Sequence, residues 1–442
     1  MKKMKQKLFV GSLALLAFMA SCSSSNDDLT GGAPSLNESS VPITFGSYLG
    51  RTATSRAGAT GVQTTATLAT NGFGLFAYYT DNSSYGTSST PNFMYNTKVT
   101  GTTKEGTTSW SYTPLRYWPN ETGTDGTNGA TSEKVDHLTF FAYAPYVTPS
   151  NNKTGAIDGA TDGITALTGN EATSDPKVTY VVAATPEKSV DLLWGVVPAG
   201  TTKWSNVTGT VIDIAEGKPY LNLIKPNTTQ KVNFNFRHAL AKLGLKVVGA
   251  FDAVTGGTKD AATKITVASV TIEGKGFKKT AVLNLNNTTA NEPLWEDVTP
   301  AATDNNINLT VSGDNLNSKI KDSGKDEAQT ADGVTETAQD LLNSDATSAQ
   351  KAFMIIPSSA TDNSLKVTID YYVNTTDASL SKGYSRVENK ITKTITGFAP
   401  EAGKNYTLLL SLGMTSVKVS ATVAAWDDKT TDTQVDLPIN VQ

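Results

Sequence analysis

The sequence predicts an all-β protein made of β-sandwiches rather than a parallel α/β sheet. Short runs of β-branched and aromatic residues recur along the chain, and turn residues bound each run. Thr, Ser, Asn and Gly are abundant while only 18% of the residues are charged, which is typical of extracellular all-β proteins. The 442 residues are enough for two domains with ordinary hydrophobic cores.

The N-terminus has the pattern of an export signal. An apolar run over residues 8–20 follows a positive region that consists of Lys2, Lys3, Lys5 and Lys7. The run is too short to span a bilayer and has the length of a signal-peptide core. It ends in Met19-Ala20-Ser21-Cys22, which resembles the lipobox of bacterial lipoprotein precursors. We therefore expect a signal peptide over residues 1–21 and a lipid on Cys22; the alternative is an ordinary secretory signal with an incidental cysteine.

Cysteine content and charge exclude several classes of protein. Cys22 is the only cysteine, so we expect no disulfide, no cysteine-based metal site and no thiol nucleophile. Lys and Arg number 37 against 41 Asp and Glu, and this balance gives no reason to expect a nucleic-acid partner. No second apolar stretch is long enough to cross a membrane.

A first strand is predicted over residues 41–49, behind a polar tether. Val41, Ile43, Phe45 and Leu49 fall on one parity, which is the period-2 signature of a half-buried strand. The next residues, 50–65, are rich in Gly, Thr, Ser and Ala and contain Arg51 and Arg56. Such a stretch is typical of an exposed, extended connection that proteases can reach.

The strands that follow are short and frequent. They are predicted at residues 72–79, 138–146, 178–183, 232–236, 243–248, 265–272, 282–285, 353–356, 365–373, 391–395, 406–412 and 417–423. Only residues 237–242 and 328–352 have a helical or ambiguous pattern. We expect a domain boundary near residues 226–231, so that the N-terminal domain covers residues 57–228 and the C-terminal domain residues 229–442.

The last residues form another alternating segment. Val435, Leu437, Ile439 and Val441 share one parity, with the size and spacing of the apolar residues in the first strand. One of these two segments could therefore replace the other in the same position. The alternative is that residues 434–442 pair within their own C-terminal domain.

Candidate sites for chemistry are few. His137 and His238 are the two histidines, and His238 is expected to pack beside a strand. Residues 158–163 hold two aspartates that could bind calcium but are more typical of a polar turn. No Gly-x-Ser-x-Gly, His-Glu-x-x-His or phosphate-binding loop motif is present. We expect no enzymatic activity, no cofactor and no metal.

A family resemblance rests on several short motifs. They are residues 72–78 (GFGLFAY), 93–96 (FMYN), 110–112 (WSY), 116–119 (RYWP), 138–145 (LTFFAYAP), 191–194 (DLLW), 234–243 (FNFRHALAKL), 355–357 (IIP), 403–407 (GKNYT) and 423–426 (VAAW). In this order, behind a lipoprotein signal, they resemble the fimbrillin-like proteins of Bacteroidetes, the subunits of type V pili. The resemblance implies two transthyretin-like β-sandwiches in tandem.

The resemblance also implies a route of assembly. Such precursors are lipidated, carried to the outer membrane and cut after an arginine, which removes the first strand and opens a groove for a neighbour's strand. Here the removable propeptide would be residues 22–56, with cleavage at Arg56-Ala57 and Arg51 as the competing site. The implied partners are other fimbrial subunits, the outer membrane through the lipid, and host or bacterial surface ligands.

Alternative interpretations remain open at this point. Both arginines could be solvated loop residues in a subunit that keeps its anchor. A surface lipoprotein that binds glycans without polymerising would present an exposed aromatic platform, for which the candidates are Tyr112, Tyr117, Trp118, Phe140, Phe141, Tyr143 and Tyr146. We expect these aromatic residues to lie in the core instead. A surface hydrolase would need acidic residues gathered in a cleft.

Overall fold

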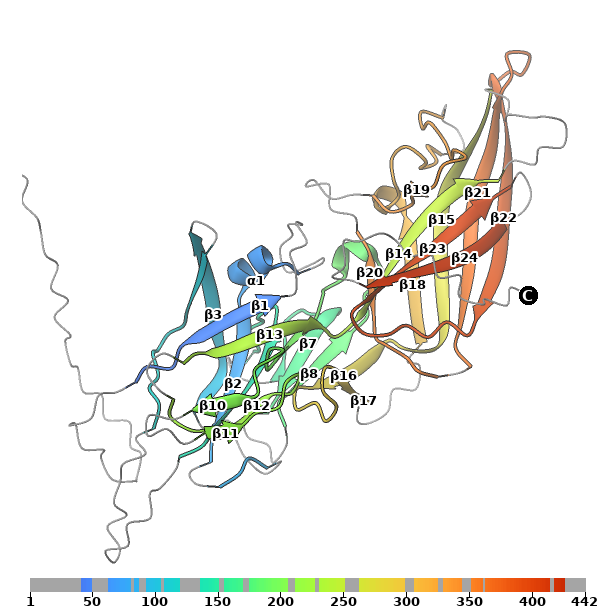
Figure 1. Ribbon diagram of the computed structural model, residues 1–442. Coiled ribbons are helices and arrows are strands. Elements are labelled where there is room, and N and C mark those ends of the chain that lie inside the picture. Colours follow the sequence, from blue (N-terminus) through green and yellow to red (C-terminus); the bar gives the residue numbers. More distant parts are fainter. Residues whose placement is uncertain are drawn as a thin grey trace, which may run out of the picture. The chain divides into compact units, whose positions relative to one another are not determined.

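In the computed structural model, the chain divides into residues 1–39 and a compact unit of residues 40–442. The structure describes residues 41–49, 63–80, 83–86, 93–104, 107–119, 136–150, 155–169, 175–205, 211–226, 230–250, 262–298, 306–324, 329–343, 351–360, 362–413 and 417–425. Almost all regular structure in these ranges is β-strand, which confirms the all-β prediction (Figure 1). No helix within them is long and apolar enough to cross a membrane.

The first sheet runs through the N-terminal half of the chain. Its strands, in spatial order, are β1 (Phe45–Leu49), β13 (Val232–His238), β9 (Leu193–Val196), β5 (Leu138–Ala144), β2 (Phe73–Tyr79), β3 (Met94–Lys104) and β4 (Thr107–Ser111), and β12 (Tyr220–Leu223) also pairs with β5. The β1–β13 pair is parallel, whereas all other pairs in this sheet are antiparallel. The first strand of the chain is therefore an edge strand beside a strand far away in sequence.

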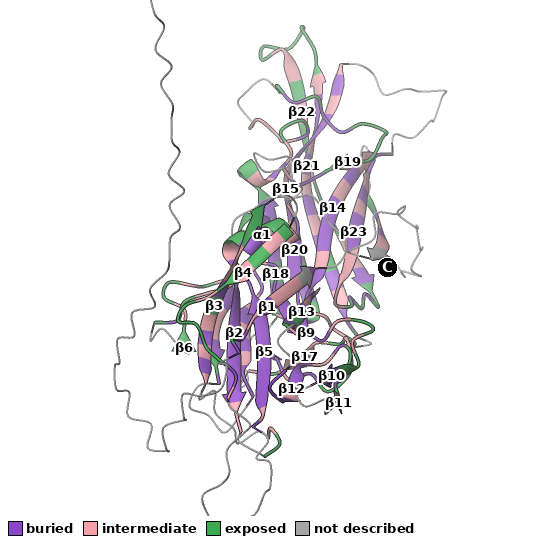
Figure 2. Cartoon of the chain, turned by 60° about the vertical axis from the view of Figure 1, so that its left-hand side comes forward, coloured by how far each residue is buried: buried purple, intermediate pink, exposed green. Residues whose placement is uncertain are grey.

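The central strands of this sheet are buried on both faces, as Figure 2 shows for β2 and β5. Phe73 and Leu75 pack into one hydrophobic cluster, while Phe76 and Tyr78 on the opposite parity pack into another. A strand covered on both sides needs apolar residues at every position. This explains why residues 72–79 are a continuous apolar run rather than an alternating one.

A second sheet joins strands from distant parts of the chain. Its order is β17 (Leu294–Glu296), β16 (Thr280–Asn284), β8 (Lys177–Val181), β7 (Gly163–Thr168) and β6 (Gly155–Ala156). The β8–β16 pairing links residues from before and after the predicted boundary near residue 228. The division into residues 57–228 and 229–442 stays a prediction.

The C-terminal half contributes two further sheets. One has the order β19 (Gln339–Asp340), β14 (Ala241–Gly249), β23 (Lys404–Leu412) and β24 (Val417–Ala425), with β20 (Phe353–Ile355) also on β14. The other has the order β18 (Asn306–Ser312), β15 (Thr263–Lys278), β21 (Ser364–Thr376) and β22 (Tyr384–Thr396). A separate hairpin pairs β10 (Lys203–Ser205) with β11 (Val211–Asp213).

Helix was predicted less well than strand. The helix α1 (Thr65–Asn71) was not expected; it begins at Thr64, whose side chain accepts a hydrogen bond from the Thr67 N–H, and it buries Leu68. Residues 237–242, left open in the sequence, belong to β13 and β14 with a two-residue connection. Residues 328–352 contain β19 and no helix in the described part, because Leu341 and Leu342 pack into the core of the sheets.

Candidate functional site

The candidate site is the position of the first strand at the edge of the first sheet. β1 pairs with β13 from Phe45 opposite Val232 to Leu49 opposite Phe236. The Val232 N–H donates to the Thr44 carbonyl at 3.0 Å just before this ladder begins. Because β13 meets β9 only from Asn235 onward, its first residues have β1 as their ladder partner in this sheet.

The apolar side chains predicted for this strand all point into the core. Val41, Ile43, Phe45 and Leu49 are 7%, 0%, 4% and 4% exposed. Burial of four such side chains is worth roughly 1.5–3 kcal/mol each. The alternating pattern in the sequence therefore identified the buried face of this segment correctly.

Phe45 lies at the centre of an aromatic cluster. Its ring centroid lies 5.2 Å from Tyr112, 6.0 Å from Phe140, 6.4 Å from Phe234 and 6.5 Å from Phe73. The contact with Phe234 is stacked and the other three are edge-to-face; aromatic pairs of both kinds add about 0.5–1.5 kcal/mol each beyond the area that they bury. Phe45 therefore joins the first strand to rings from β2, β5, β13 and the segment that follows β4.

A second segment forms backbone hydrogen bonds with residues 41–43. Residues 112–118, here called the flap, follow β4 and form an antiparallel bridge between Tyr117 and Pro42. The Ile43 N–H donates to the Arg116 carbonyl and the Trp118 N–H donates to the Val41 carbonyl, each at 2.9 Å. Residues 41–43 are therefore hydrogen-bonded to the flap, whereas residues 44–49 pair with β13.

Tyr112 adds a side-chain bond from the flap. Its hydroxyl donates to the Ile43 carbonyl at 2.9 Å. Burial raises the pKa of Tyr112 and outweighs the opposing hydrogen bond to the Arg116 backbone. The phenol therefore stays protonated at neutral pH and keeps donating this bond.

A groove runs along the part of β1 that the flap does not cover. It has a volume of about 420 Å³ and is lined by residues 44–47 of the first strand, residues 107–110 of β4, Lys231 and Asn233. At its floor Gly46 faces the Asn233 side chain, and a Cβ at Gly46 would lie 2.1 Å from Asn233 Oδ1. A side chain at position 46 would thus force Asn233 to move.

A buried contact between a histidine and an aspartate lies at the far end of β13. His238 Nδ1 is 2.9 Å from Asp191 Oδ2, and the two side chains are 2% and 0% exposed. The same Oδ2 accepts a hydrogen bond from the Gln63 N–H at 2.8 Å. Neither side chain is open to a substrate. Through Asp191, Gln63 is linked to His238 of β13, the strand that pairs with β1. Gln63 lies close to the predicted cleavage region.

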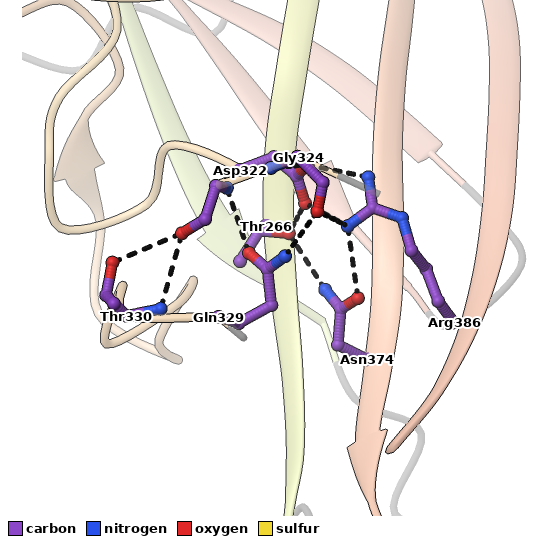
Figure 3. Close-up of polar contacts among 8 residues, drawn as sticks. Thr266, Asp322, Gly324, Gln329, Thr330, Asn374 and Arg386 are labelled. Carbon is purple, nitrogen blue, oxygen red and sulfur yellow. Dashed lines mark hydrogen bonds and ion pairs between the residues drawn. The ribbon is translucent and has the colours of Figure 1, made fainter. Parts of the chain in front are cut away.

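A second charged cluster lies on the sheet of β15, β21 and β22 (Figure 3). Arg386 on β22 donates to both carboxylate oxygens of Asp322, at 2.6 and 2.8 Å, and stacks 3.5 Å from the ring centroid of Tyr372. The Thr266 hydroxyl and the Gly324 N–H also donate to Asp322. With every oxygen of the carboxylate engaged, this cluster fastens the segment around Asp322 to the sheet and offers no reactive group.

The remaining predicted site residues lie outside the described residues. They are the lipidation residue Cys22, the processing residues Arg51, Arg56 and Ala57, and the donor residues Val435, Leu437, Ile439 and Val441. Among the predicted site residues, only Val41, Ile43, Phe45 and Leu49 of the first strand lie within the described part of the chain. The other assignments stay predictions.

The aromatic residues considered for a glycan platform lie mostly in the core. Trp118, Phe140, Phe141 and Tyr143 are at most 4% exposed, and Tyr117 is 46% exposed. In the loop considered for calcium, Asp158 accepts a hydrogen bond from the Ser150 hydroxyl. Among the residues that the structure describes, no group of three or more His, Cys, Asp or Glu side chains could hold a metal ion.

Two features of this site, the flap and Ser47, were not predicted from the sequence. The motif at residues 116–119 was noted, but nothing in the sequence indicated that its backbone pairs with residues 41–43. That pairing joins segments about seventy residues apart, and short-range patterns contain no signal for it. Ser47 could have been noticed as the polar residue on the apolar parity of residues 41–49.

Comparisons with known proteins agree with the motifs. The chain is similar to the fimbrium subunit Fim1C of Phocaeicola vulgatus, with 29% identity over 402 residues that cover 84% of this chain and 87% of that protein. A crystal structure of a fimbrial protein from Bacteroides vulgatus shares the fold, with a TM-score of 0.56 at 24% identity, covering 87% of this chain and 99% of that one. No protein-family model matches the chain. The predicted resemblance to fimbrial proteins of Bacteroidetes is confirmed.

Proposed function

We propose that this chain is a structural subunit of a cell-surface fimbria, and that its neighbours join it by replacing β1 with their own residues 435–441. The observation that carries the proposal is the placement of β1. It is a five-residue edge strand whose side chains fill an aromatic pocket made by the rest of the sheet. The similarity to a fimbrium subunit over 84% of the chain supports the same function.

Cleavage after Arg56, or after Arg51, would cut the link between β1 and the rest of the sheet. Both arginines lie between β1 and the next described residue, Gln63. Once cut, the first strand is held only by noncovalent contacts. Its departure would leave the first residues of β13 without a ladder partner and expose the rings around Phe45. An unpaired apolar edge is prone to association, so the groove is suited to receive another strand.

The energetics favour a strand of the predicted kind. Residues 435, 437, 439 and 441 are all apolar. Burial of four such side chains yields roughly 6–12 kcal/mol, and this gain has to offset an association penalty of about 4–15 kcal/mol. Ladder hydrogen bonds to β13 and to the flap add to the favourable side. Strand replacement is therefore feasible, whereas a shorter or less apolar segment would bind weakly.

The location follows from the N-terminal segment. A lipid on Cys22 would hold the precursor at the outer membrane, and cleavage would then release the subunit into the fimbria. We assign the chain no catalytic role. Its partners in this proposal are other fimbrial subunits, while the surface ligand of the assembled fimbria is left unassigned.

The test is assembly after controlled cleavage. A Cys22→Ala precursor is treated with an Arg-specific protease and run on a denaturing gel without boiling. We expect a ladder of polymers for the wild-type segment and none for a Leu437→Asp/Ile439→Asp variant, because two charges would have to enter the apolar groove. The charge-matched control is Gln434→Glu/Asn440→Asp, which places both charges on the opposite parity and should still give a ladder.

Two outcomes would contradict the proposal. A ladder from the Leu437→Asp/Ile439→Asp variant would show that residues 435–441 are not the donor. The absence of any ladder after complete cleavage would show that the protein does not polymerise by this route and would favour a monomeric surface lipoprotein.

A further inference from the structure

The inward face of β1 carries one polar side chain between two apolar ones. Ser47 shares its parity with Phe45 and Leu49, which are each 4% exposed. Its Oγ is buried and has no hydrogen-bond partner in the part of the chain that the structure describes. Its Cα pairs with that of Phe234, whose side chain is fully buried.

Nearby hydroxyl groups do not satisfy Ser47. The groove beside β1 contains Thr107, Thr108 and Ser109, yet none of them supplies a partner for the Ser47 hydroxyl. A hydroxyl that loses its water without gaining a hydrogen bond weakens the binding of the strand that carries it. The first strand therefore fits its position well at Phe45 and Leu49 and poorly at Ser47.

We propose that Ser47 makes the first strand the weaker of two occupants of this position, and that the stronger occupant is residues 435–441 of a second copy of the chain. This inference rests on the proposed function. Every second residue from 435 to 441 is aliphatic. If the odd-numbered residues of this segment take the positions of residues 45, 47 and 49, an aliphatic side chain lies opposite Phe234, whichever of them replaces Ser47.

The unpaired hydroxyl of Ser47 affects the exchange of strands only after cleavage. While β1 is joined to the rest of the chain, its effective concentration at the site is high and it stays in place despite Ser47. Once the link is cut, the departed strand competes by its intrinsic affinity alone. A serine at this one position thus allows a stable precursor and also a first strand that does not return after exchange.

The experiment uses the full chain with Cys22→Ala and with residues 53–58 replaced by the recognition sequence of a sequence-specific protease. This design makes cleavage independent of the natural enzyme. After the cut, a fluorescent peptide of residues 431–442 is added, and its uptake is followed by anisotropy while release of the N-terminal fragment is followed by chromatography. The variants are Ser47→Val and, without added volume, Ser47→Ala. The control is Ser385→Val, the same substitution at an exposed position of β22 that does not line the groove.

We expect Ser47→Val to slow peptide uptake about tenfold, since it removes the unpaired hydroxyl and adds buried apolar surface. Ser47→Ala should slow uptake in the same direction, and Ser385→Val should match the wild type. The uncut Ser47→Val precursor should also have a higher midpoint of thermal unfolding than the uncut Ser385→Val precursor.

A set of peptides tests the other side of the contact. Each peptide carries one serine, at position 435, 437, 439 or 441. The serine that faces Phe234 should lower the affinity about tenfold, while a serine at a position outside the covered register should have a smaller effect. The most sensitive position would identify the register of the incoming strand.

The failures of the two proposals are distinguishable. If the cut wild-type chain takes up no peptide, both the assembly proposal and this inference are overturned. If the wild type takes up peptide but Ser47→Val, Ser47→Ala and Ser385→Val all do so at the same rate as the wild type, only the inference about Ser47 is overturned. Equal affinity of the four serine peptides would overturn it as well.

Discussion

Asp322 shows how one carboxylate can hold a loop in place. Burial alone would raise its pKa, but the hydrogen bonds from Arg386 and Thr266 and the charge of Arg386 outweigh burial and hold the pKa of Asp322 below its usual range. The Asp322 and Arg386 side chains are 5% and 11% exposed. Removal of one member of such a pair would leave the other buried without its counter-charge.

We predict that Asp322→Asn lowers the free energy of unfolding by about 3–5 kcal/mol at pH 7. The measurement is urea denaturation, with Asp314→Asn as the control because Asp314 pairs with Lys321 but is fully exposed. The control should unfold like the wild type. Equal stability of Asp322→Asn and Asp314→Asn would contradict the role given to the buried pair.

The pH dependence of this loss has a definite sign. Because the folded-state pKa of Asp322 lies below its unfolded value of about 3.9, its stabilising effect is complete above that value and is lost as the pH falls through the folded-state pKa. The difference in the free energy of unfolding between the wild type and Asp322→Asn should therefore become smaller as the pH falls below about 4.

At the scale of the element, the first strand and the flap act as one unit. The flap pairs with residues 41–43, β13 pairs with residues 45–49, and Tyr112 bonds to the Ile43 carbonyl. The strand cannot leave unless the bonds to the flap break as well. In the proposed assembly, the flap would therefore set part of the barrier to release of the first strand.

We predict that Tyr112→Phe weakens this barrier, because it keeps the ring but removes the bond from the hydroxyl to the Ile43 carbonyl, together with the bonds between the hydroxyl and the Arg116 backbone inside the flap. The loss of one such bond is worth about 1 kcal/mol, which corresponds to a roughly fivefold faster release of the first strand after cleavage. Tyr117→Phe is the control, since Tyr117 is 46% exposed. Release is measured as the appearance of the free N-terminal fragment; equal rates for the two variants would contradict the role of Tyr112.

How far the sequence could predict these elements depends on the range of the interactions. Alternation at Val41, Ile43 and Phe45 reflects burial of one face, a local pattern, and it was predicted correctly. The parallel partner β13 lies almost two hundred residues away, and no local pattern could select it. Helix α1 was missed because its residues are mostly Thr and Ala, which give no clear amphipathic pattern.

At the scale of the whole molecule, the proposed assembly assigns to one chain both the acceptor groove under β1 and a donor segment with apolar residues at 435, 437, 439 and 441. A contact between two different surfaces of identical subunits is heterologous, and unless the rotation closes a ring it continues into a filament. Such a heterologous contact would let a filament grow by one subunit at a time, as the growth of a fimbria requires.

The central claim, that residues 435–441 of one copy occupy the place of β1 in another, can be tested by a disulfide between two chains. The acceptor carries Cys22→Ala and Asn233→Cys and lacks residues 434–442. Asn233 is exposed on β13 and faces Gly46, so its position marks the site. The donors carry Cys22→Ala, Arg51→Lys and Arg56→Lys, with a single cysteine in place of Asp436, Asn440 or Gln442.

The two proteins are mixed under mild oxidation, before and after the acceptor is cut by an Arg-specific protease. We predict a one-to-one disulfide-linked dimer with at least one of the donors, formed only with the cut acceptor and abolished when the donor also carries Leu437→Asp. No dimer from any donor, or equal dimer formation with the uncut acceptor, would contradict the claim.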